Sequence, residues 1–140
     1  WEGSAIQIYV DIIKLLEILL VSVPCIFTIA NIMLANNICD LEDDIKNRRY
    51  TLPYYIGKKN AIWLFNLLYI GAFLAIIIAV FLKLLPFITI LTLLSSIPVY
   101  KQVTLFNKNQ HKAETFVVSV KNLVLINGSF SVLLSLAILL

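Results

Sequence analysis

Four carboxylates gather within five positions of the chain, at Asp40, Glu42, Asp43 and Asp44. If a helix runs through this stretch, Asp40 and Asp44 lie one turn apart on the same face, while Glu42 points to the opposite side. Asn37 lies one turn earlier on the face of the two aspartates. The spacing therefore predicts a single stripe formed by Asn37, Asp40 and Asp44.

Two like charges this close are unfavourable unless a cation compensates them. At about 6 Å and an effective dielectric constant near 20 they repel by roughly 3 kcal/mol, and the C-terminal end of a helix adds to the cost. Mg²⁺ would compensate them, because it binds one or two carboxylates together with phosphate oxygens of a substrate. Lys46, Arg48 and Arg49 follow directly and carry the charge to hold a diphosphate. The alternative is an ordinary solvated loop.

The elements that carry this stripe are too apolar for a soluble globule. Of the 140 residues 61% are hydrophobic and 14% charged, with a mean hydropathy of +0.94, whereas a soluble domain is about 45–50% apolar and about 25% charged. Four charge-free runs approach the ~20 residues with which a helix crosses a bilayer: 18–39, 60–82, 84–100 and 122–140. The third run has room to extend into residues 102–106. We therefore expect an all-α, polytopic membrane protein with four transmembrane helices.

Other classes of protein are excluded by the same sequence. The apolar runs are too long for β-barrel strands and lack their alternation, and disordered chains are poor in apolar residues. The two cysteines, Cys25 and Cys39, provide no disulfide framework. A formal net charge of +3 gives no electrostatic support for nucleic-acid binding.

The basic residues predict how the helices are oriented. Lys14 and Lys83 lie on one side of the predicted topology. The other side holds all the remaining basic residues: Lys46, Arg48, Arg49, Lys58, Lys59, Lys101, Lys108, Lys112 and Lys121. By the positive-inside rule, the first and third connections lie in the cytoplasm and both ends of the chain lie outside. We expect a multi-pass protein of the cell membrane with the acidic stripe at its cytoplasmic face.

Several residues near or inside the predicted spans have a structural interpretation. Asp11, Lys14 and Glu17 follow one helix face and are expected to pair their charges at the start of the first helix, a buried functional triad being the alternative. Pro24 predicts a kink in the first span. Interhelical hydrogen bonds are expected from three asparagines inside the spans, Asn31, Asn66 and Asn127.

Around the acidic stripe the sequence resembles the UbiA superfamily of intramembrane prenyltransferases, and is closest there to the 1,4-dihydroxy-2-naphthoate polyprenyltransferases. The second aspartate-rich motif of that branch reads Asn-Asn-x-Arg-Asp-x-x-x-Asp, followed by a short basic stretch, Thr-Leu and a glycine. Its order and spacing are matched here by Asn36, Asn37, Asp40, Asp44, Thr51, Leu52 and Gly57. Two positions depart from the pattern: Cys39 replaces the arginine before the first aspartate, and Arg48 replaces a glycine.

The resemblance implies a site and a reaction. Asp40 and Asp44 would be the catalytic residues and would bind Mg²⁺, and the diphosphate would be held by Asn36, Asn37, Lys46, Arg48 and Arg49. The substrates would be a polyprenyl diphosphate, ionised to an allylic carbocation, and an aromatic acceptor whose ring attacks that cation. The prenyl tail would lie along apolar helix walls. Four aromatic residues of the second span either form such a wall or simply pack between helices or anchor the span: Trp63, Phe65, Tyr69 and Phe73.

The family fold has nine transmembrane helices and two facing aspartate-rich motifs, whereas this chain carries only the second motif. The chain would thus be the C-terminal half of the enzyme, residues 1–140 supplying its last four helices, active only with the N-terminal half as partner. The acceptor expected from the branch is 1,4-dihydroxy-2-naphthoate, of menaquinone synthesis, with 4-hydroxybenzoate as the alternative. The competing functions are a non-catalytic truncated homologue and a small transporter subunit with a cation site at the stripe.

Overall fold

The computed structural model describes residues 11–139, and its regular elements are helices. In chain order they are α1 (Ile12–Cys39), α2 (Leu41–Lys46), α3 (Leu52–Ile56), α4 (Lys58–Phe81), the 3₁₀ helix η1 (Phe87–Ser95), α5 (Ser96–Lys108) and α6 (Val117–Leu139). No strand occurs between residues 11 and 139, and the predicted all-α fold class is confirmed. Within residues 11–139, four segments are long and apolar enough to cross a membrane: α1, α4, η1 together with α5, and α6.

Each long helical segment extends beyond its charge-free run at one end, although the third begins at Phe87 rather than at residue 84 and α4 ends at Phe81 rather than at residue 82. α1 begins at Ile12 rather than at residue 18, and α6 begins at Val117 rather than at residue 122. The third segment runs from Phe87 to Lys108 and includes the predicted extension through residues 102–106. An absence of charge marks the part of a helix that suits lipid, whereas the helix continues as far as its backbone hydrogen bonds and caps allow.

The start of α1 is stabilised by a cap rather than by paired charges. The Asp11 side chain accepts hydrogen bonds from the backbone N–H of Ile13 at 3.0 Å and of Lys14 at 3.3 Å. This is the N-cap arrangement, which satisfies donors that the first turn leaves free. Neither Lys14 nor Glu17 forms an ion pair within residues 11–139, so the expected charge pairing is corrected to a cap.

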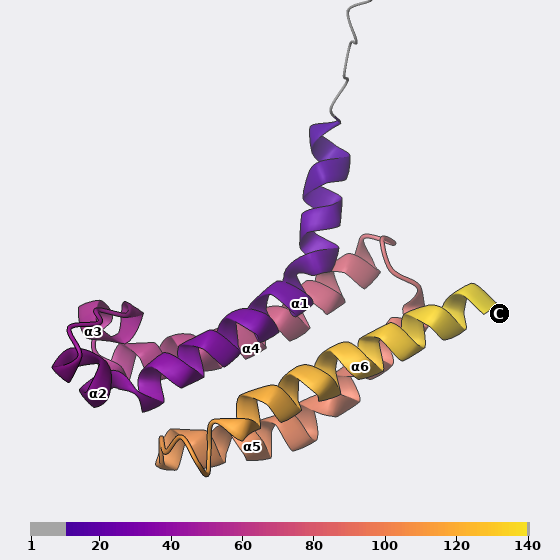
Figure 1. Cartoon of the computed structure of the whole chain (residues 1–140). Helices are drawn as coiled ribbons and strands as arrows, with labels where there is room; N and C mark the ends of the chain where they lie inside the picture. The colour runs from indigo at the N-terminus through magenta and orange to yellow at the C-terminus, as the bar shows by residue number, and fades with distance from the viewer. Residues whose placement is uncertain (1–10, 140) are drawn as a thin grey trace, which may run out of the picture.

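A bend divides α1 into two parts. Figure 1 shows the first turns of the helix directed away from the remainder, which lies along α4. Pro24 lies inside the helix and has no N–H to donate to the carbonyl of Leu20, and its ring crowds that carbonyl. The kink predicted at Pro24 is confirmed.

The third segment combines two kinds of helix. Residues 87–95 form η1, and α5 continues from Ser96. Pro98, in the first turn of α5, removes the N–H that the carbonyl of Leu94 would accept in a continuous α-helix. A 3₁₀ stretch of this length is uncommon and reflects local constraint on the backbone. Its buried residues are the threonines Thr89 and Thr92, which lie against the rest of the bundle.

The helices are joined by hydrogen bonds as well as by apolar packing. α1 packs on α4 and α6, and α6 packs on η1 and α5. Each asparagine predicted to bond between helices does so, which confirms that expectation. The Asn31 amide donates to the Phe65 carbonyl at 3.0 Å, that of Asn127 donates to the Thr28 hydroxyl at 2.9 Å, and Asn66 accepts from Asn107 at 3.1 Å.

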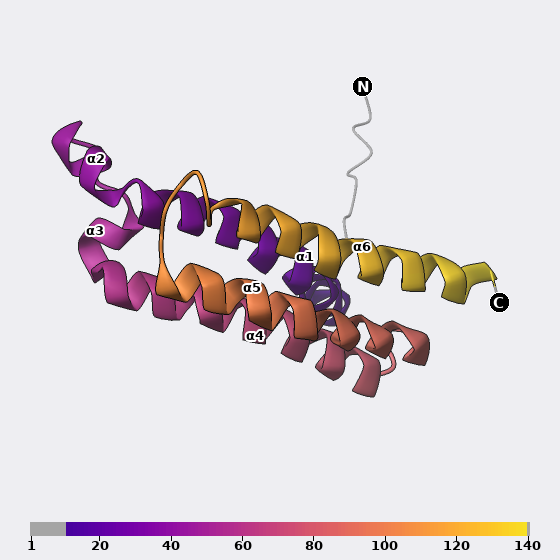
Figure 2. The same cartoon turned by 90° about the horizontal axis from the view of Figure 1, so that it is seen from below.

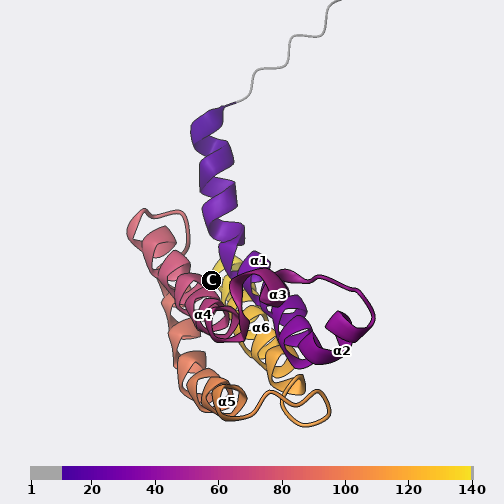
Figure 3. The same cartoon turned by 90° about the vertical axis from the view of Figure 1, so that its left-hand side faces the viewer.

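The connections divide between the two ends of the bundle. Figures 1 and 3 show α2, α3 and the α5–α6 connection at one end. The α4–η1 connection lies at the other end, and Figure 2 shows α4 and α5 running side by side between them. The first and third connections thus share one end, as the distribution of basic residues requires; which face of the membrane this end occupies stays a prediction.

Candidate functional site

Asp40 lies at the junction between α1 and α2. It is the C-cap of α1, with φ −92° and ψ 2°, and its backbone N–H donates to the Asn36 carbonyl. The helix is therefore interrupted at Asp40 rather than continuous through the acidic stripe. The interruption preserves the turn, because the Asp44 N–H donates to the Asp40 carbonyl at 2.8 Å. The two aspartates consequently remain one helical turn apart.

Asp44 is buried although it is an acid near the end of a helix bundle. The residue is 9% exposed. Its carboxylate accepts one long hydrogen bond, from the Thr51 hydroxyl at 3.4 Å, and forms no ion pair with any residue between 11 and 139. Removing a carboxylate from water is costly unless charge or hydrogen bonds compensate. Asp44 is therefore a largely buried acid with no basic partner among the described residues, and its one side-chain hydrogen bond comes from a threonine that also belongs to the motif.

Asp40 has a positive partner that the sequence did not suggest. Its Oδ2 forms an ion pair with Lys112 Nζ, and the Asp40 side chain is 21% exposed. Lys112 comes from the α5–α6 connection, so the pair links the first and third connections of the chain. The topology rule accounted for this lysine only as a basic loop residue, and no local spacing relates it to Asp40.

None of the three basic residues after the stripe forms an ion pair with Asp40 or Asp44 in the described part of the chain. Lys46 pairs with Asp43 at 3.1 Å, and both side chains are mostly exposed. Arg48 and Arg49 are exposed and form no ion pair within the described part of the chain. Their charges face solvent and are free to meet an anion.

Arg48 has a backbone role that explains why the family pattern has glycine there. Its φ is 56°, in the left-handed region. The Arg48 N–H donates to the Ile45 carbonyl at 3.1 Å, and the Arg49 N–H donates to the Asp44 carbonyl at 2.7 Å. This is the Schellman arrangement that ends many helices, in which the left-handed position is usually glycine. The turn fixes the backbone of Asp44 directly.

The two asparagines of the motif lie on the last turn of α1. Both are partly buried. The Asn36 carbonyl accepts from the Asp40 N–H at 2.9 Å. Asn37 lines a shallow groove together with Leu52 of α3 and Leu64 of α4. This end of the motif is thus packed between α1, α3 and α4, and the single stripe of Asn37, Asp40 and Asp44 stays a prediction.

The carboxylates of Asp40 and Asp44 fit a partial site for Mg²⁺. No group of three or more His, Cys, Asp or Glu side chains able to hold a metal occurs between residues 11 and 139. Mg²⁺ needs no such cage, because it commonly uses one or two carboxylates and completes its shell with water and substrate phosphate. Asp44 has no ion-pair partner within residues 11–139, and the two carboxylates offer the oxygen donors that Mg²⁺ prefers.

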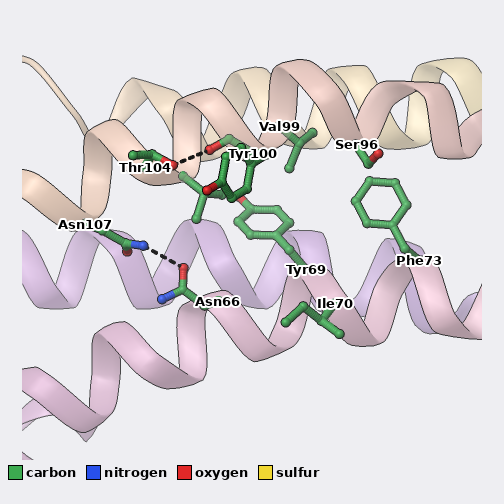
Figure 4. A pocket seen from close by; sticks show the side chains of 10 residues that line it. Asn66, Tyr69, Ile70, Phe73, Ser96, Val99, Tyr100, Thr104 and Asn107 are labelled. Atoms are coloured by element: carbon green, nitrogen blue, oxygen red, sulfur yellow. Dashed lines mark hydrogen bonds between the residues drawn. The ribbon is translucent and has the colours of Figure 1, made fainter.

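A cavity of about 360 Å³ lies between α4 and α5. Figure 4 shows Tyr69 and Phe73 on one wall and Tyr100 on the other, with the Asn66–Asn107 hydrogen bond nearby. The aromatic residues of the second span differ in role. Phe65 and Tyr69 are buried and stack edge to face, with their ring centres 5.1 Å apart. Trp63 is exposed, as a residue facing lipid would be.

Comparison with known proteins identifies the family. No curated protein and no solved structure matches the chain. A model of the UbiA prenyltransferase family matches residues 3–137, which is nearly the whole sequence. With its helical architecture and its paired aspartates, the chain belongs to the UbiA prenyltransferase family.

Proposed function

We propose that the chain is the C-terminal half of an enzyme that transfers a polyprenyl group from its diphosphate to an aromatic acceptor. Family membership supports the reaction class. The main structural support for the site is Asp44, a buried residue that lies one turn from Asp40 and has no cationic partner between residues 11 and 139. Such a group is stabilised when a divalent cation and its diphosphate bind.

Each part of the motif has a role in the proposed site. Asp40 and Asp44 would hold Mg²⁺, and Thr51 and the Schellman turn keep Asp44 directed at one place. When bound, the metal would stabilise the negative charge that develops on the departing diphosphate. The diphosphate would be contacted by residues around the aspartates: Asn36, Asn37, Lys46, Arg48 and Arg49.

The acceptor we propose is 1,4-dihydroxy-2-naphthoate, which would place the enzyme in menaquinone synthesis. The motif Asn36–Gly57 supports this choice through its resemblance to that branch. 4-Hydroxybenzoate is the competing acceptor. Supplying each acceptor separately with the same prenyl diphosphate, and measuring which one is alkylated, decides between them.

The site is tested by removing the Asp44 charge in the complete enzyme. Asp44→Asn is expected to lower Mg²⁺-dependent prenyl transfer at least about a hundredfold, because it removes a group that stabilises charge in the transition state. Glu42→Gln is the matched control, since Glu42 lies in the same helix and is exposed. Activity that survives Asp44→Asn, or falls equally with Glu42→Gln, would show that the motif is not the catalytic site and would favour a non-catalytic membrane protein.

A further inference from the structure

The ion pair between Lys112 and Asp40 is a long-range contact at the proposed site. The two residues are 72 positions apart in the sequence. Lys112 keeps a mostly exposed side chain, whereas Asp40 is largely covered. An ion pair whose lysine is mostly exposed to solvent contributes little stability, so stability alone is a weak reason for a lysine at this position.

The connection that carries Lys112 is internally ordered. The Thr115 hydroxyl accepts from the His111 N–H at 2.8 Å and donates to the His111 carbonyl at 3.0 Å. Asn109 donates to Glu114 at 3.4 Å and closes the same turn. Because Thr115 is buried, the turn is fixed to the bundle while the Lys112 side chain projects from it. Lys112 therefore extends from a hydrogen-bonded turn, and its ion pair with Asp40 links this turn to the motif.

Lys112 places a positive charge close to a position of the motif at which the family pattern has a basic residue and this chain does not. Cys39 occupies the position at which the family pattern has arginine, directly before Asp40. Lys112 and Lys58 both lie close enough to act electrostatically on Cys39. Lys112 thus brings a positive charge from the α5–α6 connection to Asp40, the residue next to that position.

We propose that Lys112 binds the diphosphate of the prenyl substrate, and that it occupies the Asp40 carboxylate only until metal and substrate bind. This inference rests on the proposed function. An ammonium group and Mg²⁺ repel each other, so Lys112 leaves Asp40 Oδ2 when that oxygen becomes a metal ligand. The flexible lysine stem then lets its three N–H donors reach a phosphate oxygen. Lys112 would contribute to substrate binding and would exclude metal from the empty site.

The test separates metal binding from diphosphate binding in the complete enzyme. Mn²⁺ serves as the probe metal, followed by the loss of its free-ion EPR signal, and inorganic pyrophosphate serves as the probe anion. In Lys112→Gln, Mn²⁺ without pyrophosphate is expected to bind about threefold more tightly, because a competing cation is gone. Pyrophosphate with Mn²⁺ is expected to bind about tenfold more weakly, because a charge-assisted hydrogen bond is lost.

Lys108→Gln is the control, since Lys108 is an exposed lysine near the same connection and forms no ion pair within residues 11–139. It should leave both affinities unchanged, and Lys112→Arg should restore pyrophosphate binding. The wild-type enzyme gives an independent measurement: Mn²⁺ alone should speed tryptic cleavage after Lys112, and added pyrophosphate should suppress it.

Two results would overturn the inference, and they are distinguishable. In the first, the wild-type enzyme binds both probes, Lys112→Gln leaves both affinities unchanged, and neither probe alters cleavage after Lys112. This result would show that Lys112 is not part of the site, and it would leave the proposed function intact. A wild-type enzyme that binds neither Mn²⁺ nor pyrophosphate would overturn the proposed function, and this inference with it.

Discussion

At the scale of single residues, Arg48 combines a strained backbone with an exposed charge. A residue with a Cβ costs roughly 1–2 kcal/mol in the left-handed region, which glycine enters freely. Arg48 nevertheless occupies the left-handed position that ends α2, with φ 56°. A diphosphate-binding role for the guanidinium would explain why the position tolerates this cost.

Arg48→Gly is expected to stabilise the turn and weaken diphosphate binding at once. The net gain in local stability is about 0.5–1 kcal/mol, because glycine relieves the left-handed strain but loses more entropy on folding. Amide exchange of the peptide over residues 41–49 should slow about two- to fivefold, and pyrophosphate affinity should fall. Arg49→Gly is the control, since Arg49 does not have a positive φ and its substitution should speed exchange. Faster exchange in Arg48→Gly would contradict the strain argument.

The sequence predicted the local relation of the two aspartates but not the contacts that they make with distant parts of the chain. The acid spacing correctly indicated that Asp40 and Asp44 are one turn apart, because that relation is local. It did not indicate that Asp44 is buried or that Lys112 reaches Asp40, since both depend on how separate helices pack. It indicated that Arg48 replaces a glycine of the family pattern but not that the backbone there is left-handed, because an arginine does not by itself indicate a positive φ.

At the scale of elements, the apolar runs predicted four spans but not their ends or their internal geometry. Hydropathy reports where a helix suits lipid, whereas caps such as Asp11 determine where it begins. The 3₁₀ stretch Phe87–Ser95 was not predicted, because its residues are apolar in the same way as those of an α-helix. Only proline predicted irregular helix geometry from the sequence, and it did so at Pro24, where α1 bends.

Pro24→Ala is expected to straighten α1, because it restores the N–H that bonds to the Leu20 carbonyl. Spin labels at Leu16 and Met33, both exposed on α1, would report the change. A straight helix separates these positions by ~26 Å at 1.5 Å per residue, and the bent wild type should give a shorter distance. Ser22→Ala is the control in the same region and should keep the shorter distance. An unchanged distance in Pro24→Ala would assign the bend to packing against neighbouring helices.

At the scale of the whole molecule, the residues of the proposed site and the most exposed apolar side chains of α1 lie in different parts of the bundle. The acidic motif and the Lys112 connection meet at one end, while the first turns of α1 carry exposed apolar side chains: Ile12, Ile13, Leu15, Leu16, Ile18 and Leu19. A surface of this kind is stable only against lipid or further protein. The arrangement follows from connectivity, since helices of alternating direction bring the first and third connections together.

The same connectivity makes a prediction about membrane orientation. With Cys25 and Cys39 replaced by alanine, a single cysteine would be introduced as Lys46→Cys, Lys108→Cys or Lys83→Cys, all at exposed positions. A maleimide that cannot cross the membrane should leave the first two unlabelled in intact cells and label Lys83→Cys, because the positive-inside rule places the basic connections in the cytoplasm. Permeabilised cells provide the control, in which all three should react. If Lys46→Cys reacted in intact cells, the orientation would be reversed. If Lys46→Cys and Lys108→Cys differed from each other, the two connections would lie on opposite faces, and the Lys112–Asp40 pair could not form in the membrane.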